Sequence, residues 1–326
     1  MTNDQLQNTY IKHFSKLKRA TNNGIKAPHK PVLLLSILQL IKKGEITSNR
    51  IFITPELVMA FKSNWNALVT TNNTCTFALP FFHLKSEPFW HLSYLQKGAS
   101  SLKSINTLKS LNDNIAFAEI DQPLFILMAG TLTNNLLEHL LIENYFPSTH
   151  ATYFMEAPLL QYTLELEIKN QIVNDSREEY QTKMQSLEEV LTDEEIQEER
   201  FIRGGIFKKE IPRIYNHQCC ISGMKIQTTS SAQMVDACHI IPFSMSNDDT
   251  ITNGICLSPN LHRAFDRGLL TINEDYIVRI SPSVNEAHSP YGITQFAGKR
   301  IFLPQEVKLY PSTQNLSWHR KECFVL

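Results

Sequence analysis

Two stretches in the last third of the chain decide its fold: DACHIIPF, residues 236–243, and NGICLSPNLHRAFDRG, residues 253–268. The first is a short, mostly apolar run that predicts a β-strand, and the NGICLSP part of the second predicts another extended segment. The following NLHRAFDRG predicts a helix of one to two turns, closed by Gly268 because glycine readily adopts the left-handed conformation that ends a helix. Residues 269–282 predict a hairpin that turns at 273–275. The predicted order is therefore strand, strand, helix and hairpin.

Both stretches resemble the HNH nucleases of the ββα-metal superfamily, in the McrA-like, restriction-type branch whose motif runs aHIxP, NGlxL and LHxxFDxG. The resemblance extends over about residues 201–285. It implies an endonuclease site in which His239 is the general base, Asn253 organises the catalytic loop and His262 binds a metal ion. The implied cofactor is a divalent metal, Mg²⁺ or Mn²⁺, and the implied partner is double-stranded DNA.

The chemistry of phosphodiester hydrolysis agrees with these roles. The reaction needs an activated water on one side of the phosphorus and stabilisation of the leaving oxygen on the other. An imidazole has a reference pKa of about 6.5, so it is largely neutral at physiological pH and can accept a proton from water. A metal ion held by few protein groups keeps open positions for the phosphate. Asn253 precedes Gly254 and can bind the loop backbone, which would hold strand and helix in register.

The residue before His239 departs from the family pattern, because many members carry a carboxylate there. In this chain the position is Cys238. Side chains alternate along a strand, so Asp236 points to the same side as Cys238, opposite to His239. Asp236 is therefore the candidate second metal ligand, directly or through water. A Cys238 thiolate is the alternative, and it suits a softer metal than Mg²⁺.

Several other active-site signatures are absent from the chain. It contains no GxSxG elbow, no GxxxxGK[ST] phosphate loop, no GxGxxG and no HExxH. Their absence argues against a serine hydrolase, an NTPase and a dinucleotide-dependent enzyme.

The N-terminal half contains a different set of elements. Residues 27–44, APHKPVLLLSILQLIKKG, predict a helix that is apolar on most sides, as the central helix of a domain would be. Residues 75–94 predict two short aromatic strands joined by a turn at 86–88. Residues 121–146 predict a return to helix, which stops before Pro147.

A second resemblance rests on APHKPVLLLSIL, LPFFHLKSEPFWHL and NYFPSTH, over about residues 8–155. These segments are similar to the N-terminal domain of predicted HNH restriction endonucleases, which is related to the DNA sulfur-binding domains of phosphorothioate-dependent type IV enzymes. The implied function is recognition of modified DNA, with phosphorothioated DNA as the candidate. Sulfur is larger and more weakly hydrated than oxygen, so an apolar cup beside cationic groups could select it.

Eight residues are candidates for contact with DNA. The apolar cup could form from Tyr145, Phe146, Pro147 and His150. The phosphate contacts could come from His29, Lys30, His83 and Lys85. The alternatives are structural: Phe146 and Pro147 can simply cap the preceding helix, and His29 and His83 can be core residues.

Charge is unevenly distributed along the chain, although the net charge is only −1. Residues 1–50 contain nine Lys or Arg and two Asp or Glu, residues 151–200 contain four and thirteen, and residues 201–326 contain thirteen and ten. A DNA-binding protein needs cationic surface only where it touches phosphate, so the neutral total does not exclude DNA. A basic stripe, either a solvated face or a phosphate contact, is formed by Lys12, Lys16 and Arg19.

Length and composition predict two domains of ordinary size, since the chain has 326 residues of which 42% are hydrophobic. No apolar run approaches the ~20 residues of a membrane-spanning helix, and the N-terminus lacks the order of a signal peptide. We therefore expect a cytoplasmic protein that does not bind a membrane. The six cysteines form no disulfide framework and are expected to be reduced.

The predicted architecture is α+β in three parts. A DNA-recognition domain of mixed helix and strand spans 1–164, an acidic helical connector spans 165–200, and the ββα-metal HNH endonuclease domain spans 201–326. Glycines 204, 205 and 223 predict turns on either side of a helix. The tail over 286–326 is expected to pack back through Phe302, Trp318 and Phe324.

The expected function is divalent-metal-dependent cleavage of DNA, restricting modified foreign DNA in bacterial defence. One alternative is restriction of base-modified or unmodified DNA. Another is a non-catalytic DNA-binding protein whose HNH site is silent because the usual acid is replaced by Cys238. One HNH site ordinarily cuts one strand, so paired cuts would favour a homodimer.

Overall fold

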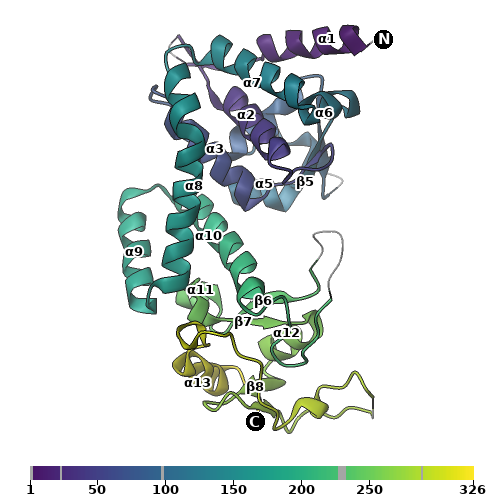
Figure 1. Ribbon diagram of the computed structural model, residues 1–326, viewed down its shortest axis with the longest axis vertical. Helices are drawn as coiled ribbons and strands as arrows, with labels where there is room; N and C mark the ends of the chain where they lie inside the picture. Colours follow the sequence, from purple (N-terminus) through teal and green to yellow (C-terminus); the bar gives the residue numbers. More distant parts are fainter. Residues whose placement is uncertain (1–2, 23, 97–98, 227–232, 288) are drawn as a thin grey trace. The chain divides into compact units, whose positions relative to one another are not determined.

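The computed structural model describes residues 3–22, 24–96, 99–226, 233–287 and 289–326 (Figure 1). Contacts divide the chain into two compact units, which are described separately. The N-terminal unit comprises Met1–Leu166 with Leu191–Ile202, and the C-terminal unit comprises Glu167–Val190 with Arg203–Leu326. The acidic segment predicted as a connector thus contributes to both units. The functional division at residues 164 and 200 stays a prediction.

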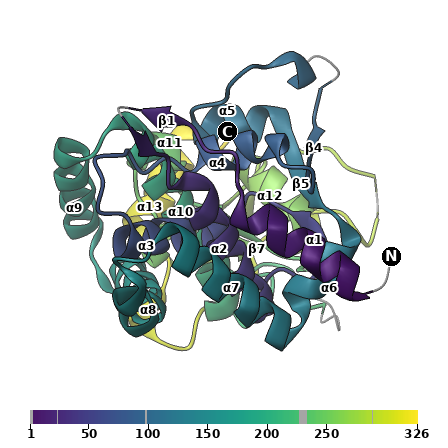
Figure 2. The same cartoon turned by 90° about the horizontal axis from the view of Figure 1, so that it is seen from above.

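The N-terminal unit is built around helix α2 (His29–Lys42), which confirms the predicted central helix. Nearly every side chain from Lys30 to Ile41 is buried, because apolar residues occupy all sides of the helix. It contacts α3 (Pro55–Leu68) and α7 (Thr131–Tyr145), and Figure 2 shows these helices gathered around it. Gly44 follows the helix end with φ of +75°, a conformation that glycine adopts without strain.

The prediction of two strands over residues 75–94 is wrong for the first of them. This segment forms α4 (Ala78–His83) and one 3-10 turn (Leu84–Ser86), and only β4 (Trp90–Tyr94) is a strand. The apolar residues are buried at helical rather than alternating spacing, as at Phe77, Phe81 and Leu84. Pro80 is tolerated because it lies in the first turn, where its missing N–H is not needed.

A small antiparallel sheet completes this unit, with strand order β3-β5-β4. The central strand β5 (Ile115–Ile120) pairs with β3 (Arg50–Ile51) and with β4, where Trp90 lies opposite Ile120. The other elements of the unit are α1 (Asn3–Ser15), the hairpin β1 (Thr21–Asn22) and β2 (Ile25–Lys26), a 3-10 turn (Ala99–Ser101), and α5 (Leu108–Asn114).

The predicted helix over 121–146 is confirmed but broken. It forms α6 (Gln122–Ala129) and α7, which are bent by 97° at Gly130. Within the described ranges, no single helix is long and apolar enough to cross a membrane. The bent pair of α6 and α7 meets the test of length and composition when its two helices are taken together.

Three long helices follow: α8 (His150–Asn174), α9 (Arg177–Val190) and α10 (Asp193–Ile214). The predicted turn at Gly204 and Gly205 is wrong, because α10 continues through both residues. Glycine costs about 1 kcal/mol relative to alanine inside a helix. Burial of Phe207 and Ile211 on the following turns offsets that cost.

The C-terminal unit confirms the predicted order of strand, strand and helix. Strand β6 (Asp236–His239) pairs antiparallel with β7 (Gly254–Leu257), with His239 opposite Gly254, and α12 (Pro259–Asp266) follows. Gly268 ends α12 with φ of +66°, and a Cβ there would overlap the backbone of Cys323. The predicted hairpin is also present, as β8 (Leu270–Ile272) and β9 (Val278–Ile280).

The tail packs back onto this unit, and of the predicted aromatics Trp318 and Phe324 are half-buried while the ring of Phe302 lies against Gly223. Helix α13 (Thr313–Glu322) buries Leu316 and His319, whereas Phe302 is 52% exposed. Short elements join these parts: α11 (Phe243–Ser246) and 3-10 turns at Ile251–Asn253, Thr294–Phe296 and Val307–Leu309.

Candidate functional site

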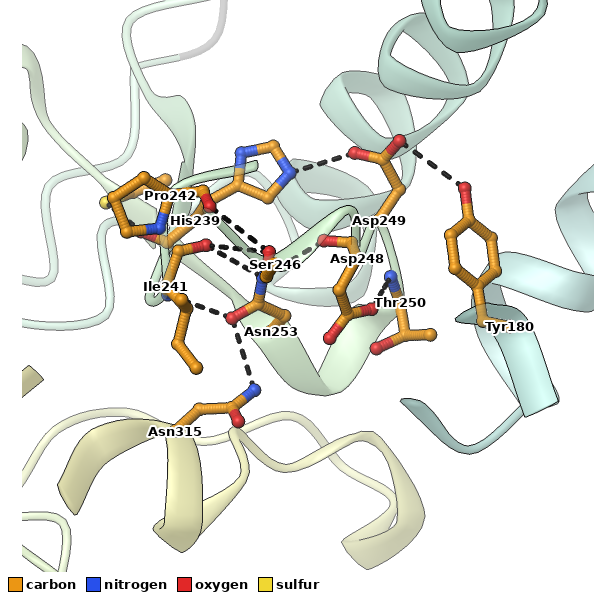
Figure 3. A network of polar contacts seen from close by, with 11 residues as sticks. Tyr180, His239, Ile241, Pro242, Ser246, Asp248, Asp249, Thr250, Asn253 and Asn315 are labelled. Atoms are coloured by element: carbon orange, nitrogen blue, oxygen red, sulfur yellow. Dashed lines mark hydrogen bonds and ion pairs between the residues drawn. The ribbon is translucent and has the colours of Figure 1, made fainter. Parts of the chain in front are cut away.

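The imidazole of His239 is held on two sides in the C-terminal unit (Figure 3). Its Nε2 lies 2.9 Å from Oδ1 of Asp249, whose side chain is only 1% exposed. The ring of Phe207, from α10, stacks on the imidazole with centroids 3.9 Å apart and planes 9° apart. The carboxylate and the aromatic ring together fix the position of the imidazole at the end of β6.

A cavity of about 360 Å³ opens beside this histidine. It brings His239 and His262 into one lining, although 23 positions separate them in the sequence. Lys208 adds a cationic group to the same lining. The remaining lining residues are Ala237, Ile240, Pro242, Phe243, Asp266, His319 and Cys323.

Asn253 is fully buried and holds the loop between the two strands. Its Oδ1 accepts hydrogen bonds from the Ile241 N–H at 2.9 Å and from Nδ2 of Asn315 at 3.1 Å. Its Nδ2 donates to the carbonyl oxygens of Ile241 and Asp248, both at 3.0 Å. These four bonds use the whole hydrogen-bonding capacity of an asparagine side chain. Asn253 therefore positions the loop and has no group left for substrate.

Three side chains beside the cavity could hold a metal ion: Cys238, His262 and Asp266, with one ligand atom of each within 4.8 Å of the others. Nε2 of His262 lies 3.5 Å from Oδ2 of Asp266, and Sγ of Cys238 lies 3.8 Å from Oδ1 of Asp266. His262 and Asp266 are four residues apart on α12 and so share one face. The carboxylate oxygen of Asp266 suits Mg²⁺ or Mn²⁺, whereas an imidazole nitrogen and a sulfur suit softer divalent metals such as Zn²⁺. The donor set therefore fits a divalent cation.

Asp236 lies outside this group of three. Its Oδ2 is 3.3 Å from Nδ1 of His262, and its side chain is about half exposed. A carboxylate on one ring nitrogen orients the other nitrogen toward a metal. The structure thus places Asp236 where it can orient His262, and its part as a direct ligand stays a prediction.

Asp249 and Asp266 are not among the site residues predicted from the sequence. Asp266 could have been found, because its spacing of four from His262 on a predicted helix places both on one face. Asp249 lies in an irregular loop, and no local pattern reveals that it meets His239. The stacking of Phe207 on His239 likewise joins distant parts of the chain, so no local pattern reveals it.

A cavity of about 440 Å³ in the N-terminal unit brings four of the predicted DNA-contact residues together. Those four are His29, Lys30, His83 and Lys85. Lys18 and Arg19 add two further cations, and apolar wall is supplied by Ile25, Ala27, Leu79 and Pro80. The cavity therefore combines cationic and apolar lining, as the prediction of an apolar cup beside cationic groups requires.

Some of these groups also have structural partners. Nζ of Lys30, a buried residue, lies 2.6 Å from Oε1 of Glu87. Nε2 of His29 lies 2.9 Å from the carbonyl oxygen of Thr74, and burial lowers the pKa of His29. Burial also lowers the pKa of His83, and the nearby charges of Lys85 and Lys30 add to this effect. Both imidazoles are therefore held in their neutral form.

The other four predicted contact residues do not line this cavity. The Tyr145 hydroxyl donates to the carbonyl oxygen of Phe14 at 2.7 Å and accepts from the Leu17 N–H at 3.0 Å. Arg19, which lines the cavity, also contacts Tyr145: its guanidinium carbon lies 4.5 Å from the centroid of the Tyr145 ring. Phe146 is buried, Pro147 is exposed, and the ring of His150 packs edge-on against Phe154.

A second basic cavity, of about 650 Å³, adjoins the first and shares Lys18, Lys85 and Ser86 with it. The predicted stripe contributes Lys12 and Lys16 to its lining. Its other lining residues are Thr9, His13, Glu87, Pro88, Trp90 and His91. The cationic lining of the unit thus continues from one cavity into the other.

A family model described as HNH endonuclease matches residues 219–273, and the chain contains an HNH endonuclease domain over these residues. Among solved structures, one described as "Modification dependent TagI restriction endonuclease" is similar at 22% sequence identity with a TM-score of 0.27. That similarity covers 36% of this chain and 36% of the other. No curated protein matches the chain.

Proposed function

We propose that this protein is a divalent-metal-dependent DNA endonuclease that restricts modified foreign DNA. The observation that carries the proposal is the shared lining of one cavity by His239 and by two members of the candidate metal group, His262 and Asp266. These residues lie on the strand and the helix of the HNH domain. A base and a cation site in the lining of one cavity are what hydrolysis of a phosphodiester requires.

Each residue has a defined part in the proposed reaction. His239 accepts the proton of the attacking water at Nδ1, because its Nε2 faces Asp249. His262, Asp266 and Cys238 would hold a divalent cation, which would supply charge stabilisation for the leaving oxygen. Lys208 lies in the same lining and attracts the DNA phosphate.

Asp266 bears on the alternative of a silent nuclease site. That alternative rested on the missing carboxylate before His239, where Cys238 stands. Asp266 brings a carboxylate to the group formed by Cys238 and His262. The acid that the motif lacks at one position is therefore available from the helix, which favours an active site.

The recognition of modified DNA is proposed for the N-terminal unit. Its first cavity places apolar groups of Ile25, Leu79 and Pro80 beside the cations Lys18 and Lys85. A phosphorothioate has one large, weakly hydrated sulfur and a negative charge, so it would gain from both kinds of wall. Base-modified DNA remains the alternative substrate. The proposed setting is the cytoplasm, where the six free cysteines would stay reduced.

The test compares one plasmid prepared with and without phosphorothioate linkages, in Mg²⁺ and in Mn²⁺, with His239→Ala as the inactive control. We expect the wild-type protein to cut only the modified plasmid and His239→Ala to bind it without cutting. Equal cutting of both plasmids would remove the sulfur specificity and keep the nuclease. Cutting of neither plasmid would favour base-modified DNA as the substrate or a silent nuclease site. Equal cutting by His239→Ala would remove the proposed base. Double-strand cuts would support action by two copies of the chain.

A further inference from the structure

Two adjacent acids, Asp248 and Asp249, lie in the loop that joins the two strands of the HNH domain. Their carboxylates contact different residues. Oδ1 of Asp249 lies 2.9 Å from Nε2 of His239, and Oδ2 of Asp249 accepts from the Tyr180 hydroxyl at 3.4 Å. Figure 3 shows the Asp249 carboxylate between the imidazole and the phenol. Both of its oxygens are thus directed by contacts from other parts of the chain.

Asp248 has the same chemistry and a similar burial but a different partner. Its Oδ1 accepts from the Thr250 N–H at 2.8 Å, which is a contact within the turn. Burial raises the pKa of Asp248. In Figure 3 its carboxylate is directed away from His239. Asp248 therefore provides an internal comparison for the loss of one buried acid from this loop.

The contact with Asp249 decides which ring nitrogen of His239 carries the proton. An ionised carboxylate accepts hydrogen bonds and cannot donate them, so the nitrogen that faces it must be the protonated one. Nε2 faces Asp249, and this leaves Nδ1 as the acceptor in the neutral ring. The stacked ring of Phe207, 3.9 Å away, opposes rotation of the imidazole out of this orientation.

Tyr180 supports the carboxylate from the side opposite to His239. It comes from α9, and burial raises the pKa of its hydroxyl, so the phenol stays protonated and can donate to Asp249. The guanidinium carbon of Arg203 lies 5.5 Å from the centroid of its ring. The acidic helix that the sequence predicts as a solvated connector thus supplies a buried contact behind the site.

We infer that Asp249 is the positioning residue for the general base: it selects the His239 tautomer with the proton on Nε2 and directs Nδ1 toward the attacking water. This inference rests on the proposed nuclease function. Asp249 itself touches neither water nor phosphate in this scheme. Its removal should therefore slow the chemical step and leave DNA binding nearly unchanged.

The test uses the full chain with two matched substitutions, Asp249→Asn and Asp248→Asn. Each replaces one buried carboxylate of the loop by an amide of the same shape. We expect Asp249→Asn to lower kcat for cutting of the phosphorothioated plasmid by about 100-fold, within the usual range for general-base catalysis, with KM changed less than about threefold. We expect Asp248→Asn to lower kcat by less than about threefold, because the Asp248 carboxylate contacts the Thr250 N–H within the turn and not His239.

A spectroscopic measurement separates positioning from a loss of folding. With ¹⁵N-labelled histidine, the two ring nitrogens of His239 report which of them carries the proton, and His239→Ala assigns the signals. The expected result is a protonated Nε2 in the wild-type protein and in Asp248→Asn, and a changed distribution in Asp249→Asn. Equal kcat values for the two asparagine variants, or a His239 tautomer that is the same in all three proteins, would overturn the positioning role alone. Failure of the wild-type protein to cut any plasmid would overturn the nuclease function and this inference with it.

Discussion

His262 and Asp266 lie one turn apart on α12, with Nε2 of the histidine 3.5 Å from Oδ2 of the aspartate. Asp236 approaches the other ring nitrogen of the same histidine at 3.3 Å. One imidazole therefore lies between two carboxylates. Asp266 belongs to the candidate metal group with Cys238, whereas Asp236 contacts only the other side of the imidazole. This difference suggests different parts for the two acids.

Asp266→Ala should weaken metal binding more than Asp236→Ala. Asp266 offers an oxygen to the group of three, and removal of a direct ligand should cost more than the 10- to 100-fold typical of an orienting partner, so we expect about 100-fold or more. Calorimetric titration of the full chain with Mn²⁺, without DNA, measures both variants. If Asp236→Ala had the larger effect, Asp236 would be the direct ligand, as the sequence analysis predicts.

Cys238→Asp should shift the metal preference toward Mg²⁺. A carboxylate is a hard oxygen ligand, whereas a thiolate favours softer cations, so we expect the ratio of cutting rates in Mn²⁺ and Mg²⁺ to fall by about fivefold or more. The measurement is a set of initial rates on one plasmid over a range of each metal. Cys256→Ser is a useful control, since Cys256 is a buried thiol on the paired strand outside the group of three. An unchanged ratio in Cys238→Asp would show that residue 238 is not a ligand.

Lys85→Ala should weaken DNA binding by the N-terminal unit. Lys85 lines both basic cavities, so its loss would remove a cation available to phosphate in either one. We expect weaker affinity and a salt dependence reduced by about one unit of slope in log Kd against log salt. Fluorescence anisotropy with full-length His239→Ala as the parent avoids cutting during the measurement.

The matched control is Lys109→Ala, because Lys109 is an exposed cation that lines neither of the two basic cavities. Its substitution should leave the slope unchanged. Identical slopes for the two alanine variants would exclude these cavities as the phosphate-binding surface.

The stability of the C-terminal unit should fall in acid because of His319. Burial lowers its pKa to about 4, and both ring nitrogens have partners, Thr271 Oγ1 at 2.9 Å and the Phe265 carbonyl oxygen at 3.0 Å. The unfolded chain binds the proton near pH 6.5 and the folded chain only near pH 4, so the contribution is present above pH 6.5 and is lost as pH falls through that window. By pH 4.5 the loss should be on the order of 2 kcal/mol.

Urea unfolding followed by the fluorescence of Trp318, a neighbour of His319 on α13, measures this effect when Trp65 and Trp90 of the N-terminal unit are replaced by Phe in both proteins. His319→Gln should be less stable than the wild-type protein at neutral pH and should lose less stability between neutral pH and pH 4.5. Parallel losses in the two proteins would show that His319 does not titrate in this range.

Local patterns were sufficient to predict much of the fold. Central helix α2, the strand–strand–helix order and the hairpin after Gly268 depend on residues close together in sequence, and all three are present. The prediction of two strands over residues 75–94 was wrong for the first strand, because a short aromatic run is compatible with both a buried helix and a strand. Tertiary burial of Phe77 and Phe81 decided in favour of the helix. Burial likewise kept α10 helical through Gly204 and Gly205.

The candidate site shows the same division between local and distant contacts. The motif identified His239 and His262, which the structure places in the lining of one cavity. The spacing on α12 contained the information for Asp266. The contacts of His239 with Asp249 and Phe207 join parts of the chain that no short pattern relates.

The stacking of Phe207 on His239 has a consequence for how such nucleases can be exchanged between proteins. The matched HNH segment begins at residue 219, yet the ring that stacks on His239 comes from residue 207 and the phenol that donates to Asp249 comes from residue 180. A chimaera joined at the edge of the motif would carry His239 without the groups that fix its ring. A transplantable cutting module would have to bring the preceding pair of helices as well, and shorter grafts should inherit the metal group but turn over slowly.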